Sequence, residues 1–310
     1  MNIVYFGSSK FSLVILENLC LAKFSPKLVV SQPDKPKGRG LKAQATEISL
    51  FAKKANLPLI TPQSLKTNET KEKLSTFSPD LFIIADYGKI LPAPLLTIPK
   101  IASIGVHPSL LPAYRGPAPI NWAILHGDKE TGVTIFKMDA GLDTGDIILQ
   151  KTITISEDDN AYTLHEKLAC EGAKLLIESL GMIKNGGYKA VSQNEAFSSF
   201  ASKFRKEDGR IKWQEAATDI RNKIRAMFGW PSAYTFYKGK TIKITEAEVL
   251  TATGEAEPST IETIKKDGIY VSTGNGILKI KRLKPEGKRE MDAYSFVLGH
   301  GLKIGDKFEP

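Results

Sequence analysis

The sequence predicts an α/β protein with two domains, a Rossmann-like, doubly wound N-terminal domain followed by a small OB-like β-barrel. The chain has 310 residues, a length typical of about two domains. Its first part alternates short apolar runs with segments of helical period, which indicates a mainly parallel sheet covered by helices on both faces. From residue 204 the pattern changes to several short strands separated by turns, as in a small barrel.

The N-terminal domain is expected to span residues 1–185. Apolar runs bounded by loop residues predict its strands, and apolar residues at helical spacing predict its helices. The expected strands are 2–6, 27–31, 81–85, 101–106, 131–138 and 147–155. The expected helices are 11–22, 43–56 and 160–183, and the last of these closes the domain.

A linker is expected at residues 186–203, because Asn185, Gly186 and Gly187 begin a polar stretch. The C-terminal domain then spans residues 204–310. It begins with an amphipathic helix at 213–227, and alternating segments after that helix predict strands. Those segments are 241–249, 268–273 and 276–283.

The formal net charge of +9 favours a polyanionic partner, although charge alone is a weak indication. No apolar run approaches the roughly 18 residues that cross a bilayer, and the N-terminus lacks a secretion signal. We therefore expect a cytoplasmic protein without a membrane partner. Cys20 and Cys170 lie in apolar, helix-like surroundings and are expected to be buried free thiols in a reducing compartment.

Several other classes of protein are disfavoured. None of the four histidines pairs with a cysteine or another histidine at metal-ligand spacing, so no metal site is expected. The first turn, Gly7-Ser8-Ser9-Lys10, has a single glycine, which argues against a dinucleotide-binding dehydrogenase. The sequence has no additional amphipathic helix that would need a second subunit to cover its apolar face, so a monomer is expected.

A histidine stands where open α/β sheets place their sites. His107 ends a predicted strand, and Pro108 after it favours an extended backbone. Ligands in such folds bind beyond the carboxyl ends of the strands. Taken alone, His107 is better interpreted as a strand-terminal residue whose ring is satisfied by a backbone carbonyl.

The segments around His107 form a specific set of motifs. Ser109-Leu110-Leu111-Pro112 follows the histidine, and Leu142-Asp143-Thr144-Gly145 supplies a later turn. The other segments that agree are 32–40, 87–92, 131–134, 224–226, 230–231 and 274–276. Together they resemble the folate-dependent formyltransferases almost from end to end, and in particular the branch that acts on methionyl-tRNA.

The resemblance implies that His107 and Asp143 are the catalytic pair. Attack of an amino group on a formyl carbon produces a negatively charged oxygen, which a protonated imidazole can stabilise. A nearby carboxylate favours that protonated form and can move protons between the attacking amine and the leaving nitrogen. The plainer alternative for Asp143 is a turn-capping aspartate beside Gly141 and Gly145.

One position departs from the family pattern. Gly105 stands where the family has its catalytic asparagine, whose side chain would project beside His107 because alternate strand residues share a face. The loss of one oxyanion donor costs about 10²–10³ in rate. Reduced turnover is therefore expected, unless water or another donor fills the place. Ser103 shares the parity but lies two residues further back and is a poor substitute.

The resemblance also implies a site for 10-formyltetrahydrofolate as co-substrate. Its pteridine ring would be held largely by backbone around 87–92 and 139–143. The implied contact residues are Ser109, Leu110, Leu111, Pro112, Tyr87, Gly88, Ile90, Leu91 and Asp139. Plain core packing is the alternative for Leu110 and Leu111, and the role of Asp86 stays open.

Initiator methionyl-tRNA is the partner that the resemblance implies. The basic loop 33–42 would enter the region of the acceptor stem, and a basic stripe at 279–289 fits an OB-type groove for RNA backbone. The implied contacts are Arg39, as the principal one, with Lys35, Lys37, Lys42, Lys281 and Arg282. The alternatives are a solvated charged loop and a hydrated strand face.

Two other functions stay open. A sugar-nucleotide N-formyltransferase would share the catalytic segment, although the basic loop and the second domain argue against it. A folate- or tRNA-binding relic would bind both ligands without transferring the formyl group, and only Gly105 suggests it.

Overall fold

The computed structural model describes residues 1–37, 42–250 and 256–309, and the chain forms two compact units. The first unit contains Met1–Pro119, Glu130–Thr154 and His165–Ala201. The second unit contains Ile120–Lys129, Ile155–Leu164 and Ser202–Pro310. Each unit has its own sheet and its own buried core. The predicted boundaries at residues 185 and 204 stay a prediction.

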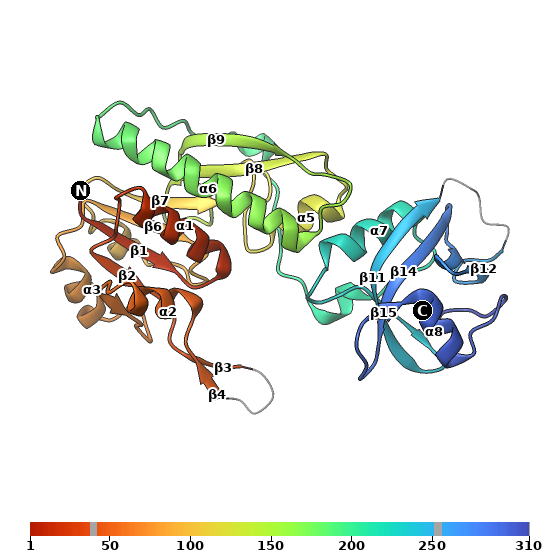
Figure 1. Ribbon diagram of the computed structural model, residues 1–310. Helices are drawn as coiled ribbons and strands as arrows, with labels where there is room; N and C mark the ends of the chain where they lie inside the picture. The colour runs from red at the N-terminus through yellow and green to blue at the C-terminus, as the bar shows by residue number, and fades with distance from the viewer. Residues whose placement is uncertain (38–41, 251–255, 310) are drawn as a thin grey trace. The chain divides into compact units, whose positions relative to one another are not determined.

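The first unit is built on a seven-stranded sheet in the order β5-β2-β1-β6-β7-β8-β9 (Figure 1). The parallel strands are β1 (Ile3–Gly7), β2 (Leu28–Val30), β5 (Leu59–Ile60), β6 (Leu81–Ala85) and β7 (Ala102–His107). The strands that extend it antiparallel are β8 (Glu130–Lys137) and β9 (Ile147–Thr154). The chain leaves β1 toward β2 and returns to β6 on the other side of β1. The loops after β1 and β6 therefore lead to opposite sides of the sheet, which makes this a topological switch point.

Helices cover both faces of this sheet, because the side chains on both faces of strands such as β1 and β6 are apolar and buried. The α-helices up to residue 184 are α1 (Lys10–Leu21), α2 (Glu47–Lys54), α3 (Asn68–Ser75), α4 (Ala93–Leu96), α5 (Pro119–Leu125) and α6 (Ala161–Lys184). Of these, α5 belongs to the second unit. Tyr5 of β1 points to α1, where its hydroxyl donates to the carbonyl of Ser12 at 2.6 Å. Phe6 faces the other way and packs with Leu74 of α3 and Leu95 of α4.

The helix α6 lies on the same face as α1, over the part of the sheet that carries His107. A Cβ added to Gly172 of α6 would be 3.3 Å from Val106 of β7 and 3.4 Å from Val133 of β8. The ring of His165 in α6 lies 5.5 Å from that of Phe11 in α1, centroid to centroid. The predicted Rossmann-like, doubly wound sheet is confirmed, and the long apolar strands and α6 agree with the predicted segments to within about two residues.

Some predicted elements were wrong or missed. The helix predicted at 43–56 begins only at Glu47, because Thr46 caps it by accepting a hydrogen bond from the amide of Ser49 at 3.1 Å. The residues before the cap form β4 (Lys42–Gln44), which pairs with β3 (Lys35–Lys37) in a hairpin. The helices α3, α4 and α5 were missed because four to eight residues give too short a periodic pattern.

The second unit is an antiparallel sheet in the order β10-β11-β14-β13-β12, with β15 beside β14 (Figure 1). Its strands are β10 (Tyr234–Tyr237), β11 (Lys240–Leu250), β12 (Ile261–Lys265), β13 (Gly268–Ser272), β14 (Ile277–Pro285) and β15 (Met291–Asp292). The C-terminal tail links the two edges: the amide of Glu309 donates to Phe236 of β10, and that of Phe308 donates to Ser259 just before β12. This arrangement is consistent with the predicted small barrel.

The α-helices of the second unit are α5, α7 (Ala217–Ala226) and α8 (Ala293–His300). The helix predicted at 213–227 begins only at Ala217, because Trp213 packs in the core before the helix starts. Its indole donates to the hydroxyl of Thr235 at 3.0 Å and stacks on Phe308. A large aromatic residue beside a helical pattern resembles the first helical turn in sequence, and only the packing separates the two.

The structure bears on two expectations about the whole chain, one on membrane-spanning helices and one on the cysteines. Within the described ranges, no helix is both long and apolar enough to pass through a bilayer. Cys20 and Cys170 are free, but Cys20 is half-buried and Cys170 is exposed on α6. The prediction of buried thiols was therefore wrong, since an apolar neighbourhood in sequence does not fix which side of a helix faces the sheet.

Candidate active site

His107 lies at the carboxyl end of β7 with only 6% of its surface exposed. Its Nε2 is 2.8 Å from the carbonyl oxygen of Tyr114. Because a carbonyl can only accept, Nε2 carries the hydrogen in that bond. The other ring nitrogen, Nδ1, faces the carboxylate of Asp143, 3.6 Å from Oδ2. Both interpretations of His107 therefore hold at once. One ring nitrogen bonds a backbone carbonyl, and the other faces Asp143.

Asp143 lies in the turn between β8 and β9, with a backbone φ of +55°. Aspartate is among the few residues that adopt this left-handed conformation readily. Its Oδ2 accepts a hydrogen bond from the amide of Gly116 at 2.9 Å. The structure thus brings the two predicted catalytic side chains together, while their catalytic roles stay a prediction.

Gly105 lies under an aromatic ring. It pairs with Phe136 of β8, and a Cβ added to Gly105 would collide with Cε1 and Cζ of that ring. Phe136 is buried, so the space beside His107 that an asparagine would enter is filled by an apolar group. Ser103 is not a replacement donor, since its hydroxyl donates to the carbonyl of Leu96 at 2.9 Å. Sequence reasoning missed Phe136, because the register of β8 against β7 was not predictable.

The loop 109–112 is held in place by β8 and β9. The hydroxyl of Thr134 donates to the carbonyl of Ser109 at 2.6 Å and accepts from the amide of Leu111 at 3.1 Å. The side-chain amide of Gln150 donates to the carbonyl of Leu111 at 2.8 Å. Leu111 is buried, so it also serves core packing. Thr134 belongs to a motif that the sequence singled out, but neither it nor Gln150 was assigned a role.

Tyr87 is a core residue rather than a side chain that lines a site. Its ring packs edge-on against Phe6, and burial raises the pKa of its hydroxyl to about 12. Its carbonyl accepts hydrogen bonds from Gln32 Nε2 at 2.6 Å and from Ser8 Oγ at 3.0 Å. Any contact of this residue with a ligand would therefore involve the main chain, as the prediction of backbone recognition implies.

The loops 87–92 and 139–143, which the resemblance assigns to the folate, contain exposed apolar side chains and tight turns. Ile90 is 77% exposed and Leu142 is 44% exposed, although both are apolar. The Oδ1 of Asp139 accepts from the amide of Gly141 at 2.9 Å and from Thr144 Oγ1 at 2.7 Å, so this carboxylate shapes its own turn. Asp86 adopts a φ of +41°, which explains locally why an aspartate suits this position.

The predicted tRNA contacts fall into two groups. Lys35, Lys37 and Lys42 belong to the β3–β4 hairpin, and Arg39 lies outside the described residues. In the second unit, Lys281 is 2.8 Å from Glu246 and 2.9 Å from Glu248. The Nη2 of Arg282 is 3.6 Å from Glu290, and Lys279 is 2.8 Å from Asp267. Carboxylates thus neutralise part of the basic stripe. The sequence of the stripe did not indicate this, because Glu246, Glu248 and Asp267 lie on other segments.

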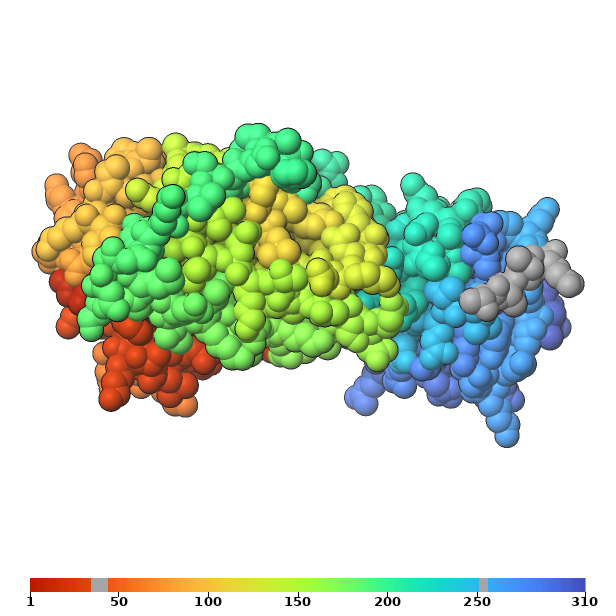
Figure 2. All heavy atoms as spheres, turned by 90° about the horizontal axis from the view of Figure 1, so that it is seen from above, coloured from red at the N-terminus to blue at the C-terminus, as the bar shows by residue number. Residues whose placement is uncertain are grey.

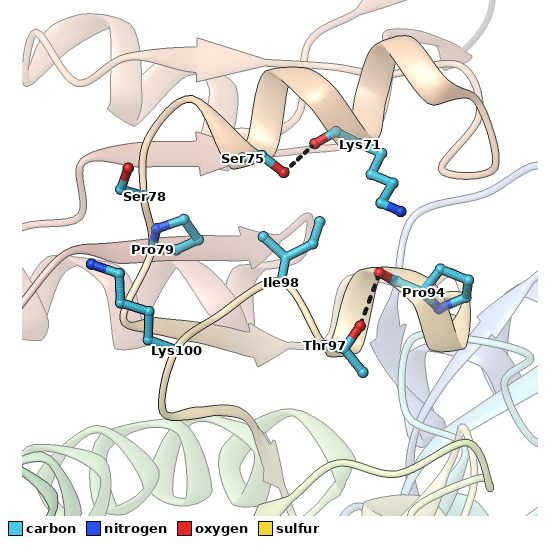
Figure 3. Close-up of a pocket in the computed structure, with 8 residues that line it drawn as sticks. All are labelled: Lys71, Ser75, Ser78, Pro79, Pro94, Thr97, Ile98 and Lys100. Atoms are coloured by element: carbon cyan, nitrogen blue, oxygen red, sulfur yellow. Dashed lines mark hydrogen bonds between the residues drawn. The ribbon is translucent and has the colours of Figure 1, made fainter.

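A hollow of about 360 Å³ lies elsewhere in the first unit (Figure 3). It is lined by residues of α3, of α4 and of the segments that precede β6 and β7. Among them are Lys71, Pro79 and Lys100. Since His107 ends β7 and Lys100 precedes it, the hollow lies at the opposite ends of the strands. In the described part of the chain, no group of three or more His, Cys, Asp and Glu side chains could hold a metal ion.

Comparisons with known proteins agree with the motifs. The formyl transferase family matches residues 1–180, and the formyl transferase C-terminal domain matches residues 203–301. The methionyl-tRNA formyltransferase of Caldanaerobacter subterraneus subsp. tengcongensis is 42% identical, over 98% of this chain and 99% of that relative. The methionyl-tRNA formyltransferase of Thermodesulfovibrio yellowstonii is 43% identical, over 98% and 97% respectively. This chain belongs to the methionyl-tRNA formyltransferase family. The prediction of a formyltransferase enzyme is confirmed.

Solved structures share the fold of the methionyl-tRNA formyltransferase family at lower identity. WlaRD, a sugar 3N-formyl transferase determined in the presence of dTDP and 5-N-formyl-THF, superposes with a TM-score of 0.66 at 21% identity, over 93% of this chain and 99% of that one. HypX from Aquifex aeolicus in complex with tetrahydrofolic acid superposes with a TM-score of 0.64 at 18% identity, over 98% of this chain and 48% of that one. At such identities the likeness supports the fold alone.

Proposed function

We propose that this chain transfers the formyl group of 10-formyltetrahydrofolate to the α-amino group of methionyl initiator tRNA. The family supports this reaction, because relatives named for it match almost the whole chain. The observation that carries the proposal is the convergence of His107 Nδ1 and Asp143 Oδ2 at the carboxyl ends of the strands. A metal takes no part in the proposal.

The hydrogen bonds of His107 identify the nitrogen that would act. Nε2–H is held by the Tyr114 carbonyl, so Nδ1 is the nitrogen that faces the reaction, on the side of Asp143. When protonated, Nδ1–H donates to the oxygen that becomes negative as the amine attacks the formyl carbon. Asp143 takes a proton from the attacking amine and delivers one to the leaving nitrogen as the carbon–nitrogen bond breaks, directly or through water.

The folate would bind beside this pair, at the loops that the resemblance assigns to it. Met138 packs against the buried cluster to which Tyr87 and Leu91 belong, so the segments 87–91 and 138–142 border the same core. Each of them exposes an apolar side chain, Ile90 in one and Leu142 in the other. A flat ring that contacts apolar side chains and hydrogen-bonds the main chain suits such a surface.

The tRNA would be held by the basic hairpin and by the second unit. The segment 33–42 contains Lys35, Lys37, Arg39 and Lys42 against the single acid Asp34, and such a segment attracts phosphates. The ion pairs of Lys281 and Arg282 make the stripe on β14 the weaker of the two candidates. We extend the proposal to a cytoplasmic monomer that acts at the start of translation.

The test is formyl transfer by the purified chain to charged initiator tRNA, with an amino-sugar nucleotide as the competing acceptor. We expect formylmethionyl-tRNA, and we expect His107→Ala and Asp143→Asn to lower kcat by about 10²–10⁴-fold. His126→Ala is the matched control, since this exposed histidine lies outside the site. Transfer to the sugar nucleotide alone would overturn the proposal. Binding of both ligands without transfer would identify a relic.

A further inference from the structure

The segment 191–201, which the sequence assigns to the linker, is joined to the first unit at both ends. At one end Val191 pairs with Ile147 of β9 through backbone hydrogen bonds of 2.8 and 2.9 Å. At the other end the amide of Arg115 donates to the carbonyl of Ser199 at 2.9 Å. The segment lies on the surface of the first unit, within the green part of the chain in Figure 2. It is therefore fixed beside the candidate active site.

Between these ends, the side chain of Gln193 connects the segment to the turn that carries Asp143. Its Nε2 donates to the carbonyl of Asp143 at 2.8 Å and to that of Gly145 at 2.7 Å. Its Oε1 accepts from Arg115, at 3.1 Å from Nε and 2.8 Å from Nη2. Arg115 is 8% exposed and also pairs with Glu195 at 2.7 Å. The amide of Gln193 is thus oriented from both sides.

The turn at Asp143 depends on such support. Its positive φ is less favourable than the right-handed region even for aspartate, and it persists where the surroundings fix it. A Cβ at Gly145 would collide with the carbonyl of Lys137, so the turn also packs tightly against the end of β8. Gly116, which donates to the Asp143 carboxylate, directly follows Arg115. Neighbouring groups therefore hold both the main chain and the side chain of Asp143.

We propose that Gln193 is a positioning residue for formyl transfer, oriented by Arg115. This inference rests on the proposed function of His107 and Asp143. The two hydrogen bonds from Gln193 keep the turn in the conformation in which the carboxylate faces His107 Nδ1. A misplacement of about 1 Å at a reacting group can cost about 10²-fold in rate. The predicted linker is then part of the catalytic apparatus.

Two substitutions separate the roles of the Gln193 amide. Gln193→Ala removes both donors, whereas Gln193→Glu keeps the size and the acceptor for Arg115 but turns an oxygen toward the carbonyls of Asp143 and Gly145. We expect both to lower kcat by about 10–10²-fold, with a change in KM for either substrate of less than about threefold. A Gln193→Glu variant with the kcat of the unmodified chain would overturn the inference.

The control variant is Asn194→Ala. Its side chain accepts a hydrogen bond from the amide of Ala196 at 3.1 Å, in the same segment but away from the Asp143 turn. It should retain the kcat of the unmodified chain. A loss equal to that of Gln193→Ala would mean that any change in this segment reduces activity, and would overturn a specific role for Gln193.

A double-mutant cycle distinguishes positioning from a general structural loss. Because Gln193 would act through Asp143, adding Gln193→Ala to Asp143→Asn should reduce kcat little further. Losses that multiply would overturn the inference. The urea midpoint of each variant shows whether it is folded.

The amide of Gly116 gives a readout that needs no activity. In a chain labelled with ¹⁵N-glycine, its NMR signal should move in Gln193→Ala and Asp143→Asn, because its acceptor is the Asp143 carboxylate. It should stay in place in Asn194→Ala. An unmoved signal in Gln193→Ala overturns the positioning role. An unmodified chain that forms no product overturns the proposed function, while the signal still decides the positioning.

Discussion

Gly105 and Phe136 act as one unit at the scale of single residues. They are cross-strand partners on the face that also carries His107, and the ring of Phe136 covers the glycine. An asparagine in place of Gly105 would contribute a polar donor there. A buried aromatic ring contributes none, and it also excludes water from the same space. The structure therefore strengthens the hypothesis of reduced turnover that Gly105 alone suggested.

This pair predicts that restoring the asparagine needs two changes. Gly105→Asn alone should overpack the strand pair and destabilise the fold by about 1–3 kcal/mol. In Gly105→Asn/Phe136→Leu the distal ring atoms are gone, and kcat should rise by about 10²-fold over Phe136→Leu alone. Single-turnover rates and urea unfolding measure the two effects. If the double variant is no faster than Phe136→Leu, the hypothesis of a missing donor is wrong.

At the scale of elements, β8 supports the loop after β7 from the side. The hydroxyl of Thr134 satisfies the carbonyl of Ser109 and the amide of Leu111 at once. Thr131, three residues earlier on the same strand, is equally buried, but its hydroxyl has no hydrogen-bond partner among the residues described. The strand thus contains a matched pair of threonines, one engaged with the site and one not.

The contrast predicts opposite effects of the same substitution. Thr134→Val leaves two buried backbone groups unpaired and should cost about 1–3 kcal/mol of unfolding free energy. It should also raise the KM for the folate, since the loop 109–112 loses its anchor. Thr131→Val removes a buried hydroxyl without a partner and should be neutral or stabilising. Urea unfolding and folate kinetics compare them. Equal losses in both variants would contradict the assigned role of Thr134.

At the scale of the whole molecule, net charge does not locate the binding surface. The excess of +9 suggested a polyanionic partner, and the stripe on β14 looked like one candidate groove. Two of its lysines, Lys279 and Lys281, however, form ion pairs with Glu246, Glu248 and Asp267. An ammonium already paired with carboxylates gains less from a phosphate than a free one does. The segment 33–42, which has a single acid, is therefore the better candidate.

This distribution predicts how tRNA binding depends on salt. Lys37→Ala/Lys42→Ala should weaken binding and reduce the slope of log K against log salt concentration by about 1–2. The kcat at saturating tRNA should stay unchanged. Lys281→Ala should have the smaller effect on binding, because Glu246 and Glu248 already neutralise that lysine. Filter binding at several salt concentrations measures both. A larger loss in Lys281→Ala would assign the main contact to β14 instead.

The sequence by itself determined the fold class, the main strands and the identity of the candidate pair. Apolar periodicity is a local property, so β6 at 81–85 and the long helix α6 could be predicted from it. The Ser109–Pro112 and Leu142–Gly145 motifs singled out His107 and Asp143 for the same reason, since a motif is a short stretch of chain.

Only the tertiary structure decided what surrounds that pair. The ring over Gly105, the amide of Gln193 on the Asp143 turn and the carboxylates around Lys281 each join residues that are far apart in the chain. Strand register and side-chain direction determine such contacts, and neither leaves a periodic signal in the sequence. The chemistry of the site could therefore be predicted from its residues, whereas its geometry depended on how distant segments pack together.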